Sequence, residues 1–174
     1  GETVVDVHLA VAGDTAVEPD EAFTVTLADP VGGSLGDATA TVHIGDDDPV
    51  QLSVSAPTVT EGTGGLTPAT FTVGLAPGLP AGTTVSVDYT VEGLSASVPD
   101  DVAAASGTLA FAAGDAPKTV TVDVVGDDQV EGPEGFRLAL TNARASDGRA
   151  VLPADVDPAV IVDDDAAAPT PTPT

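Results

Sequence analysis

The chain contains two copies of one pattern, and this repeat constrains its fold more than any other feature. Residues 7–14, VHLAVAGD, align with residues 120–127, VTVDVVGD, and the alignment continues without a gap from VEPDEAF at 17–23 to VEGPEGF at 130–136. After a four-residue insertion in the second copy, the DDD triplet at 46–48 aligns with the one at 163–165. Because a repeated segment of this kind is one supersecondary unit, we expect two related domains in tandem.

Alternating apolar and polar residues predict short strands and no helices. Hydrophobic residues make up 42% of the chain and aromatic residues only 3%, with 19 Gly and 15 Pro, a mix that favours strands and turns. In the second copy the alternation predicts seven strands, at residues 51–55, 70–75, 84–91, 107–111, 119–125, 136–141 and 159–162. We therefore predict an all-β fold, a seven-stranded antiparallel β-sandwich over residues 50–165.

The first copy is incomplete. Residues 1–48 supply the last three strands of an equivalent unit, at 4–11, 22–27 and 39–44, and nothing in them matches residues 50–117. We expect the missing half to lie upstream in a longer polypeptide, and the exposed strand edges to fray or to pair with another molecule. Residues 166–174, AAAPTPTPT, are expected to form an extended linker, or a terminus without a role.

The charge balance points to cations as partners. The chain has 28 acidic residues, four basic residues and a formal net charge of -24. Nucleic-acid binding is excluded as a leading idea because phosphate contacts need clustered Lys and Arg. Anionic membrane surfaces are disfavoured, and no apolar run is long enough to be inserted across a bilayer. The chain has no cysteine, so thiolate metal sites are not available.

Acidic residues of the second copy concentrate at the predicted strand ends. Strand ends of a sandwich gather at two poles, so several of these loops can converge. Ca²⁺ takes six to eight oxygen ligands in flexible geometry, which acidic loops provide. The alternatives are a solvated, solubilising face and an adaptation to high salt. We call this set the second cluster; its members are Glu61, Asp101, Asp127, Asp128, Glu131, Glu134, Asp163, Asp164 and Asp165.

An ordered series of motifs resembles the Calx-beta domain, a module of sodium–calcium exchangers and of many bacterial surface proteins. The series runs VTEG, VSVDYTVEG, SGTLAF, KTVTVDVVGDDQVEGPEGFRLAL and VIVDDD. It covers residues 51–165 as a whole domain and residues 1–48 as the C-terminal part of another. The resemblance implies a seven-stranded immunoglobulin-like sandwich that binds several Ca²⁺ at one pole.

The resemblance also assigns ligands. Glu61 matches the acid of the first strand region, Asp101 the aspartate before the SGTL strand, and the other members of the second cluster the acidic loop and the terminal acids. Val102 and Gly126 depart from the pattern, Gly126 standing where the exchanger module has a further acid, so fewer ions are expected. A weaker site is implied in the first copy, where Thr15 replaces an aspartate. We call its matching acids the first cluster: Asp14, Glu18, Glu21, Asp46, Asp47 and Asp48.

The expected function is that of an extracellular calcium-binding module in a tandem array of a bacterial secreted or cell-surface protein. Ca²⁺ would rigidify the junctions with neighbouring repeats, and the array would serve adhesion to a cell-surface or matrix partner. The alternative is a calcium-independent spacer in a multidomain secreted enzyme. An exchanger-like sensor is disfavoured because no membrane segment accompanies the domain. Catalysis is not expected, because the complete copy has no histidine and a Glu131–Glu134 pair lacks the aromatic platforms of sugar sites.

Overall fold

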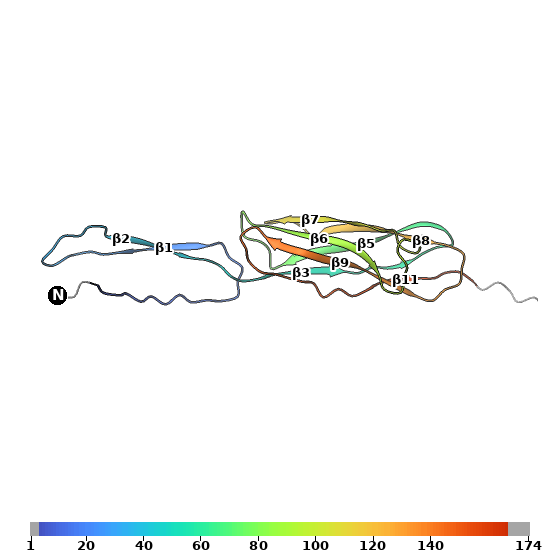
Figure 1. Ribbon diagram of the computed structural model, residues 1–174, viewed down its shortest axis with the longest axis horizontal. Coiled ribbons are helices and arrows are strands. Elements are labelled where there is room, and N and C mark those ends of the chain that lie inside the picture. Colours follow the sequence, from blue (N-terminus) through green and yellow to red (C-terminus); the bar gives the residue numbers. More distant parts are fainter. Residues whose placement is uncertain (1–3, 167–174) are drawn as a thin grey trace, which may run out of the picture.

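The computed structural model describes residues 4–166, which form a β-hairpin followed by a sandwich of two β-sheets (Figure 1). One sheet of the sandwich has the strand order β10-β3-β5-β8, and the other has the order β4-β11-β9-β6-β7. The sandwich strands are β3 (Val50–Ser55), β4 (Thr58–Thr60), β5 (Gly65–Ala76), β6 (Thr84–Gly93), β7 (Ser106–Ala112), β8 (Lys118–Gly126), β9 (Glu134–Ala145), β10 (Val151–Leu152) and β11 (Ala159–Val162).

The sandwich confirms the predicted fold class. All seven predicted strands are present, as β3, β5, β6, β7, β8, β9 and β11. The sequence did not predict β4 and β10, because runs of three and two residues are too short to show an alternating pattern. These two strands pair in parallel, β4 with β11 and β10 with β3, whereas the other paired strands of the sandwich are antiparallel.

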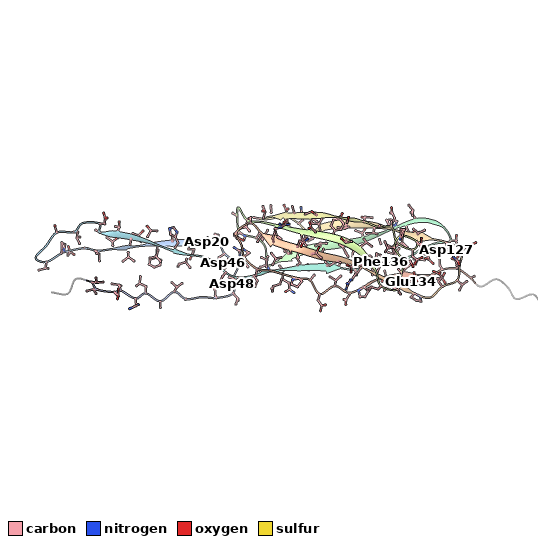
Figure 2. All side chains as sticks on the ribbon, viewed as in Figure 1. Asp20, Asp46, Asp48, Asp127, Glu134 and Phe136 are labelled. Atoms are coloured by element: carbon pink, nitrogen blue, oxygen red, sulfur yellow. The ribbon has the colours of Figure 1, made fainter. Side chains whose placement is uncertain are left out.

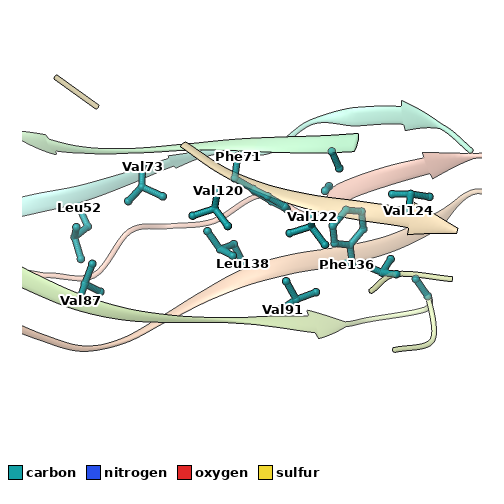
Figure 3. Packing of buried hydrophobic residues seen from close by; sticks show 14 of the residues in the cluster. Leu52, Phe71, Val73, Val87, Val91, Val120, Val122, Val124, Phe136 and Leu138 are labelled. Carbon is teal, nitrogen blue, oxygen red and sulfur yellow. The ribbon is translucent and has the colours of Figure 1, made fainter. Parts of the chain in front are cut away.

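The core lies between the two sheets and is built from the inward residues of each strand (Figure 3). Phe71 on β5 and Phe136 on β9 are fully buried, with ring centroids 5.6 Å apart and planes at 86°. This edge-to-face contact joins the two sheets and adds to the hydrophobic stabilisation. Phe136 follows two residues after Glu134, so the same strand fixes a core residue and an acid of the second cluster.

The first copy forms the hairpin of β1 (Glu21–Thr26) and β2 (Thr39–Ile44). Its register repeats that of β9 and β11: Phe23 pairs with Val42 as Phe136 pairs with Ala159. These are counterparts in the sequence alignment, so the two copies share local structure as well as sequence.

The predicted strand at 4–11 is wrong: these residues form no strand, and Val7, Leu9 and Val11 are 69%, 57% and 54% exposed. In the second copy the equivalent strand, β8, pairs with β5 along nine residue pairs. The first copy has no counterpart of β5 in this chain, so the backbone groups of residues 4–11 have no strand to bond.

The predicted linker lies outside the described residues except for Ala166. Within residues 4–166, no helix is both long and apolar enough to pass through a lipid bilayer.

Truncating the side chain that joins the two sheets tests this packing. Phe136→Ala removes a fully buried ring and leaves a cavity, so we expect the free energy of unfolding to fall by about 3–5 kcal/mol in a urea titration. Phe23→Ala changes the equivalent position in the hairpin and is expected to leave unfolding of the sandwich unchanged. An equal loss in the two variants would contradict the assignment of Phe136 to the sandwich core.

Candidate metal centre

The second cluster lies at the end of the sandwich that points away from the hairpin (Figure 2). β4, β8 and β11 end there at Thr60, Gly126 and Val162, and β9 begins there at Glu134. The pairing of Glu134 with Ile161, and of β11 with β4, holds these ends in one place. The loops that follow the strand ends therefore bring acids from distant parts of the sequence together.

Six of the nine predicted residues form two compact groups. Glu61, Asp163 and Asp165 each place a carboxylate oxygen within 4.8 Å of the other two, and Asp101, Glu131 and Glu134 do the same. Ca²⁺ binds oxygen at 2.3–2.6 Å, so two oxygens within 4.8 Å of each other can both contact one ion. The remaining members of the cluster are Asp127, Asp128 and Asp164.

Backbone hydrogen bonds to the carboxylates fix the acidic loops. Asp163 accepts from the N–H groups of Glu131 and Asp165, both at 2.7 Å, and so joins the loop after β8 to the segment after β11. Asp164 accepts from the N–H of Gly62 at 3.0 Å, which ties in the loop after β4. Asp163 and Asp164 therefore join the three acidic segments through hydrogen bonds of the protein itself.

Asp101 reaches the cluster because its segment adds to the edge of β8. The Asp101 carbonyl accepts from the N–H of Val125 at 2.8 Å, and the N–H of Ala103 donates to the carbonyl of Asp123 at 2.9 Å. Its carboxylate accepts from the N–H of Ser97 at 2.6 Å. The loop between β6 and β7 thereby supplies an acid to the same end of the sandwich.

The electrostatics of the second cluster are unfavourable without a cation. Glu61 is only 5% exposed, and burial, together with the charges of Asp163 and Asp127, raises the pKa of its carboxyl to about 7. Burial also raises the pKa of Asp165, whose Oδ2 is buried and has no hydrogen-bond partner among the described residues. The ion pairs found within residues 4–166 involve no member of the second cluster.

These residues fit a hard divalent cation. Their donors are all oxygen, which suits Ca²⁺ and does not suit a metal that prefers nitrogen or sulfur. The partnerless Oδ2 of Asp165, beside Glu61 and Asp163, is the kind of buried acceptor that a bound ion would satisfy. A fully solvated acidic face would not bury Glu61 among other carboxylates.

Gly126 shows why the acid expected at this position is absent. A Cβ added at Gly126 would lie 2.1 Å from the carbonyl oxygen of Gly62 and 2.7 Å from that of Glu61. The backbone that carries Glu61 thus packs directly on Gly126, and a side chain there would push it away.

The first cluster repeats this hydrogen bonding at the other end of the sandwich. Asp46 accepts from the N–H groups of Glu18 at 2.6 Å and Asp48 at 3.0 Å, as Asp163 does from Glu131 and Asp165. These bonds are the main reason that the pKa of Asp46 is lowered. One open pocket of about 280 Å³ is lined by all six predicted acids: Asp14, Glu18, Glu21, Asp46, Asp47 and Asp48.

The first cluster also contacts a basic residue, Arg149, that could not be foreseen from the sequence. Arg149 Nη1 donates to Asp46 Oδ2 at 2.8 Å, and Arg149 Nε donates to Asp147 Oδ2 at 2.7 Å. The arginine side chain is only 3% exposed. No local sequence signal could have revealed this contact, because Arg149 and Asp46 lie 103 residues apart.

Comparison with solved structures supports the same fold. The apo form of the Calx CBD1 domain matches with 25% identity and a TM-score of 0.52, over 67% of this chain and 98% of that one. The CBD12 structure of CALX1.2 matches with 26% identity and a TM-score of 0.51, over 66% of this chain and 46% of that one. A third match, described as the calcium-binding domain CBD12 of CALX1.1, has 24% identity, a TM-score of 0.50 and coverage of 67% and 47%.

The chain thus spans nearly all of the single CBD1 domain and about half of each CBD12 chain. Among curated proteins, no relative was found. The family model described as the Calx-beta domain matches residues 1–48 and again residues 46–165, which together include both acid clusters. With the repeat, the sandwich and this match in agreement, the chain belongs to the Calx-beta domain family.

Proposed function

We propose that the second cluster binds Ca²⁺ and that the chain serves as a calcium-binding module in a tandem array. The observation that carries this proposal is the approach of Glu61, Asp163 and Asp165 within 4.8 Å, with Glu61 buried and an oxygen of Asp165 without a partner. Three acids brought together from two loops repel one another unless a cation lies among them. The likeness to Calx structures described by the same CBD designation supports the choice of ion.

Glu61, Asp163 and Asp165 would hold one ion, and Asp101, Glu131 and Glu134 would hold a second. A bound Ca²⁺ supplies positive charge that offsets the repulsion between the loops. Asp163 joins two loops through the backbone N–H groups that it accepts from. Glu134 lies on the same strand as Phe136, so an ion bound at Glu134 would also restrain the strand that enters the core. The outcome is a stiffened end of the sandwich, with no catalytic role for these carboxylates.

We place the module outside the cell, in a secreted or surface-attached protein in which arrays of such domains set the reach of an adhesive or matrix-binding part. The repeated copies within this chain, the Pro- and Thr-rich end of the sequence and the net charge of -24 support this placement. Neighbouring repeats of the same polypeptide would be its immediate partners.

A calcium-independent spacer in a multidomain secreted enzyme is the second candidate. It is favoured by Arg149, which already supplies positive charge to the first cluster. The two functions differ in whether calcium stabilises the fold.

Calcium should raise the melting temperature of the full chain. A ligand that binds only the folded state at about a hundred times its dissociation constant adds about 2.7 kcal/mol of stability. We expect calorimetry to show an increase of several degrees when chelator is replaced by millimolar calcium, and expect Glu61→Gln to reduce this increase.

Asp155→Asn is the matched control for that experiment, because Asp155 is an exposed acid outside both clusters. It should keep the full response to calcium. A melting temperature that is the same with chelator and with calcium would reject the calcium site and favour the spacer.

The stability of the metal-free protein should fall as the pH rises. The pKa of Glu61 is about 7 when folded against an ordinary value of 4.5, so the folded state holds a proton that the unfolded state has lost between these values. The free energy of unfolding therefore decreases with pH across that window. The raised pKa values of Asp165 and Glu134 act in the same direction.

Groups with lowered pKa values, such as Asp46 and Asp147, do not oppose this trend, because their contribution is complete above their ordinary value of 3.8. Urea unfolding in the presence of EDTA at about pH 5 and about pH 8 measures the difference. In Glu61→Gln the decrease should be smaller. An equal decrease in the free energy of unfolding between the two pH values in the wild type and the variant would show that Glu61 does not titrate in this window.

A further inference from the structure

Arg149 joins the sandwich to the hairpin unit through the first cluster. It lies in the loop between β9 and β10, and its guanidinium reaches both acidic segments of the first copy. Besides Asp46 and Asp147, Nη1 donates to the carbonyl of Asp48 at 3.4 Å and Nη2 donates to the carbonyl of Glu18 at 3.4 Å. The side chain of Asp46 is only 8% exposed. The contact is therefore a buried one and is only weakly screened by salt.

The oxygen that Arg149 binds has a known equivalent in the second copy. Asp46 and Asp163 occupy the same repeat position, and each accepts from two backbone N–H groups at equivalent positions of its own copy. Oδ2 of Asp46 accepts from Glu18 and from Arg149, whereas Oδ2 of Asp163 accepts, among the described residues, from Glu131 alone, and the Asp163 carboxylate lies near those of Glu61 and Asp165. Both copies gather acids around this position, and the first copy also has a guanidinium bound to its central aspartate.

Apolar contacts strengthen the junction around Arg149. Val17 of the first copy is half-buried and packs against the core of the sandwich, whereas its counterpart Val130 is 54% exposed. Within the sandwich, the N–H of Val50 on β3 donates to the carbonyl of Ala150 at 3.1 Å, which holds in place the loop that carries Arg149. The first copy is therefore docked on the sandwich at the place where the ion pair forms.

The charge balance of this contact favours a permanent cation. Burial alone would lower the pKa of Arg149, but hydrogen bonds from its guanidinium to Asp147 and Asp46 raise it above the usual range. An arginine side chain stays protonated in proteins and cannot diffuse away, unlike a bound ion. Removing Arg149 would leave the buried carboxylate of Asp46 without its cation, which is strongly unfavourable, whereas removing the charge of Asp46 would leave Arg149 paired with Asp147 within the sandwich.

We propose that Arg149 supplies the positive charge of the first cluster. Its guanidinium binds Asp46 in place of a metal ion and fixes the first module to the second without calcium. This inference does not require calcium at the second cluster. With this role for Arg149, the first cluster is a contact between the two domains, where the sequence led us to expect a weak calcium site.

Spin labels on the two modules test the proposal. The chain has no cysteine, so Thr41→Cys on β2 and Thr119→Cys on β8, both exposed, give one label on each module. With EDTA we expect a narrow distribution of label-to-label distances that calcium does not narrow further. Arg149→Gln and Asp46→Asn should each broaden it, because the default state of two linked domains without a strong interface is relative motion.

Matched controls separate this contact from general loss of charge. Arg144→Gln removes an arginine from β9, and Asp163→Asn removes the counterpart of Asp46; both should keep the narrow distribution. Adding Arg149→Gln to Asp46→Asn should have little further effect, since the two residues act on one contact. Asp46 lies outside the sandwich, so its variant reports on the junction even if Arg149→Gln reduces the stability of the sandwich.

Two results would overturn the proposal. One is a wild-type distribution that is broad in EDTA and narrows with calcium, which would make the junction calcium-dependent. The other is a distribution in Asp46→Asn that is as narrow as that of the wild type. The melting-temperature experiment tests only the calcium site, and the label distances test only the Arg149 contact. Failure of the calcium site can therefore be distinguished from failure of this proposal.

Discussion

Repulsion between carboxylates at the ends of strands is the constraint on which the rest of this structure depends. The fold brings Glu61, Asp163 and Asp165 together because they follow the paired strands β4 and β11. The carboxylates cannot move far apart unless this pairing is broken. Neighbouring charges at such distances cost more as the surrounding dielectric constant falls. Each cluster therefore needs positive charge, and the two copies obtain it differently: the first from Arg149, and the second, by our proposal, from Ca²⁺.

The repeat makes this comparison possible. Asp46 and Asp163 lie in the same backbone arrangement: each accepts from two equivalent N–H groups, and each follows a strand that is paired in the same register. The clusters therefore differ chiefly in what packs against this shared arrangement, besides the replacement of one loop aspartate by Thr15. At the first cluster the loop after β9 supplies Arg149, whereas at the second cluster the loops after β4 and β6 supply the acids Glu61 and Asp101.

Much of the fold could be predicted from the sequence, because strand alternation and the repeat are local or regular signals. The alignment of Phe23 with Phe136 anticipated a shared strand pairing, and the structure shows it. The failures have physical causes. Residues 4–11 have the alternation of a strand but no partner strand, and β10 is too short to show any alternation. At the site, residue types could place acids at strand ends, but the contacts of Arg149 depend on how two modules pack.

The most direct measurement is a calcium titration followed by NMR, with amide signals assigned in both copies. The amides of Glu131 and Asp165, which donate to Asp163, report on the second cluster, and those of Glu18 and Asp48, which donate to Asp46, report on the first. The account predicts that calcium shifts the signals of Glu131 and Asp165 at concentrations that leave those of Glu18 and Asp48 unchanged. Shifts of all four amides with one midpoint, or of none, would contradict it.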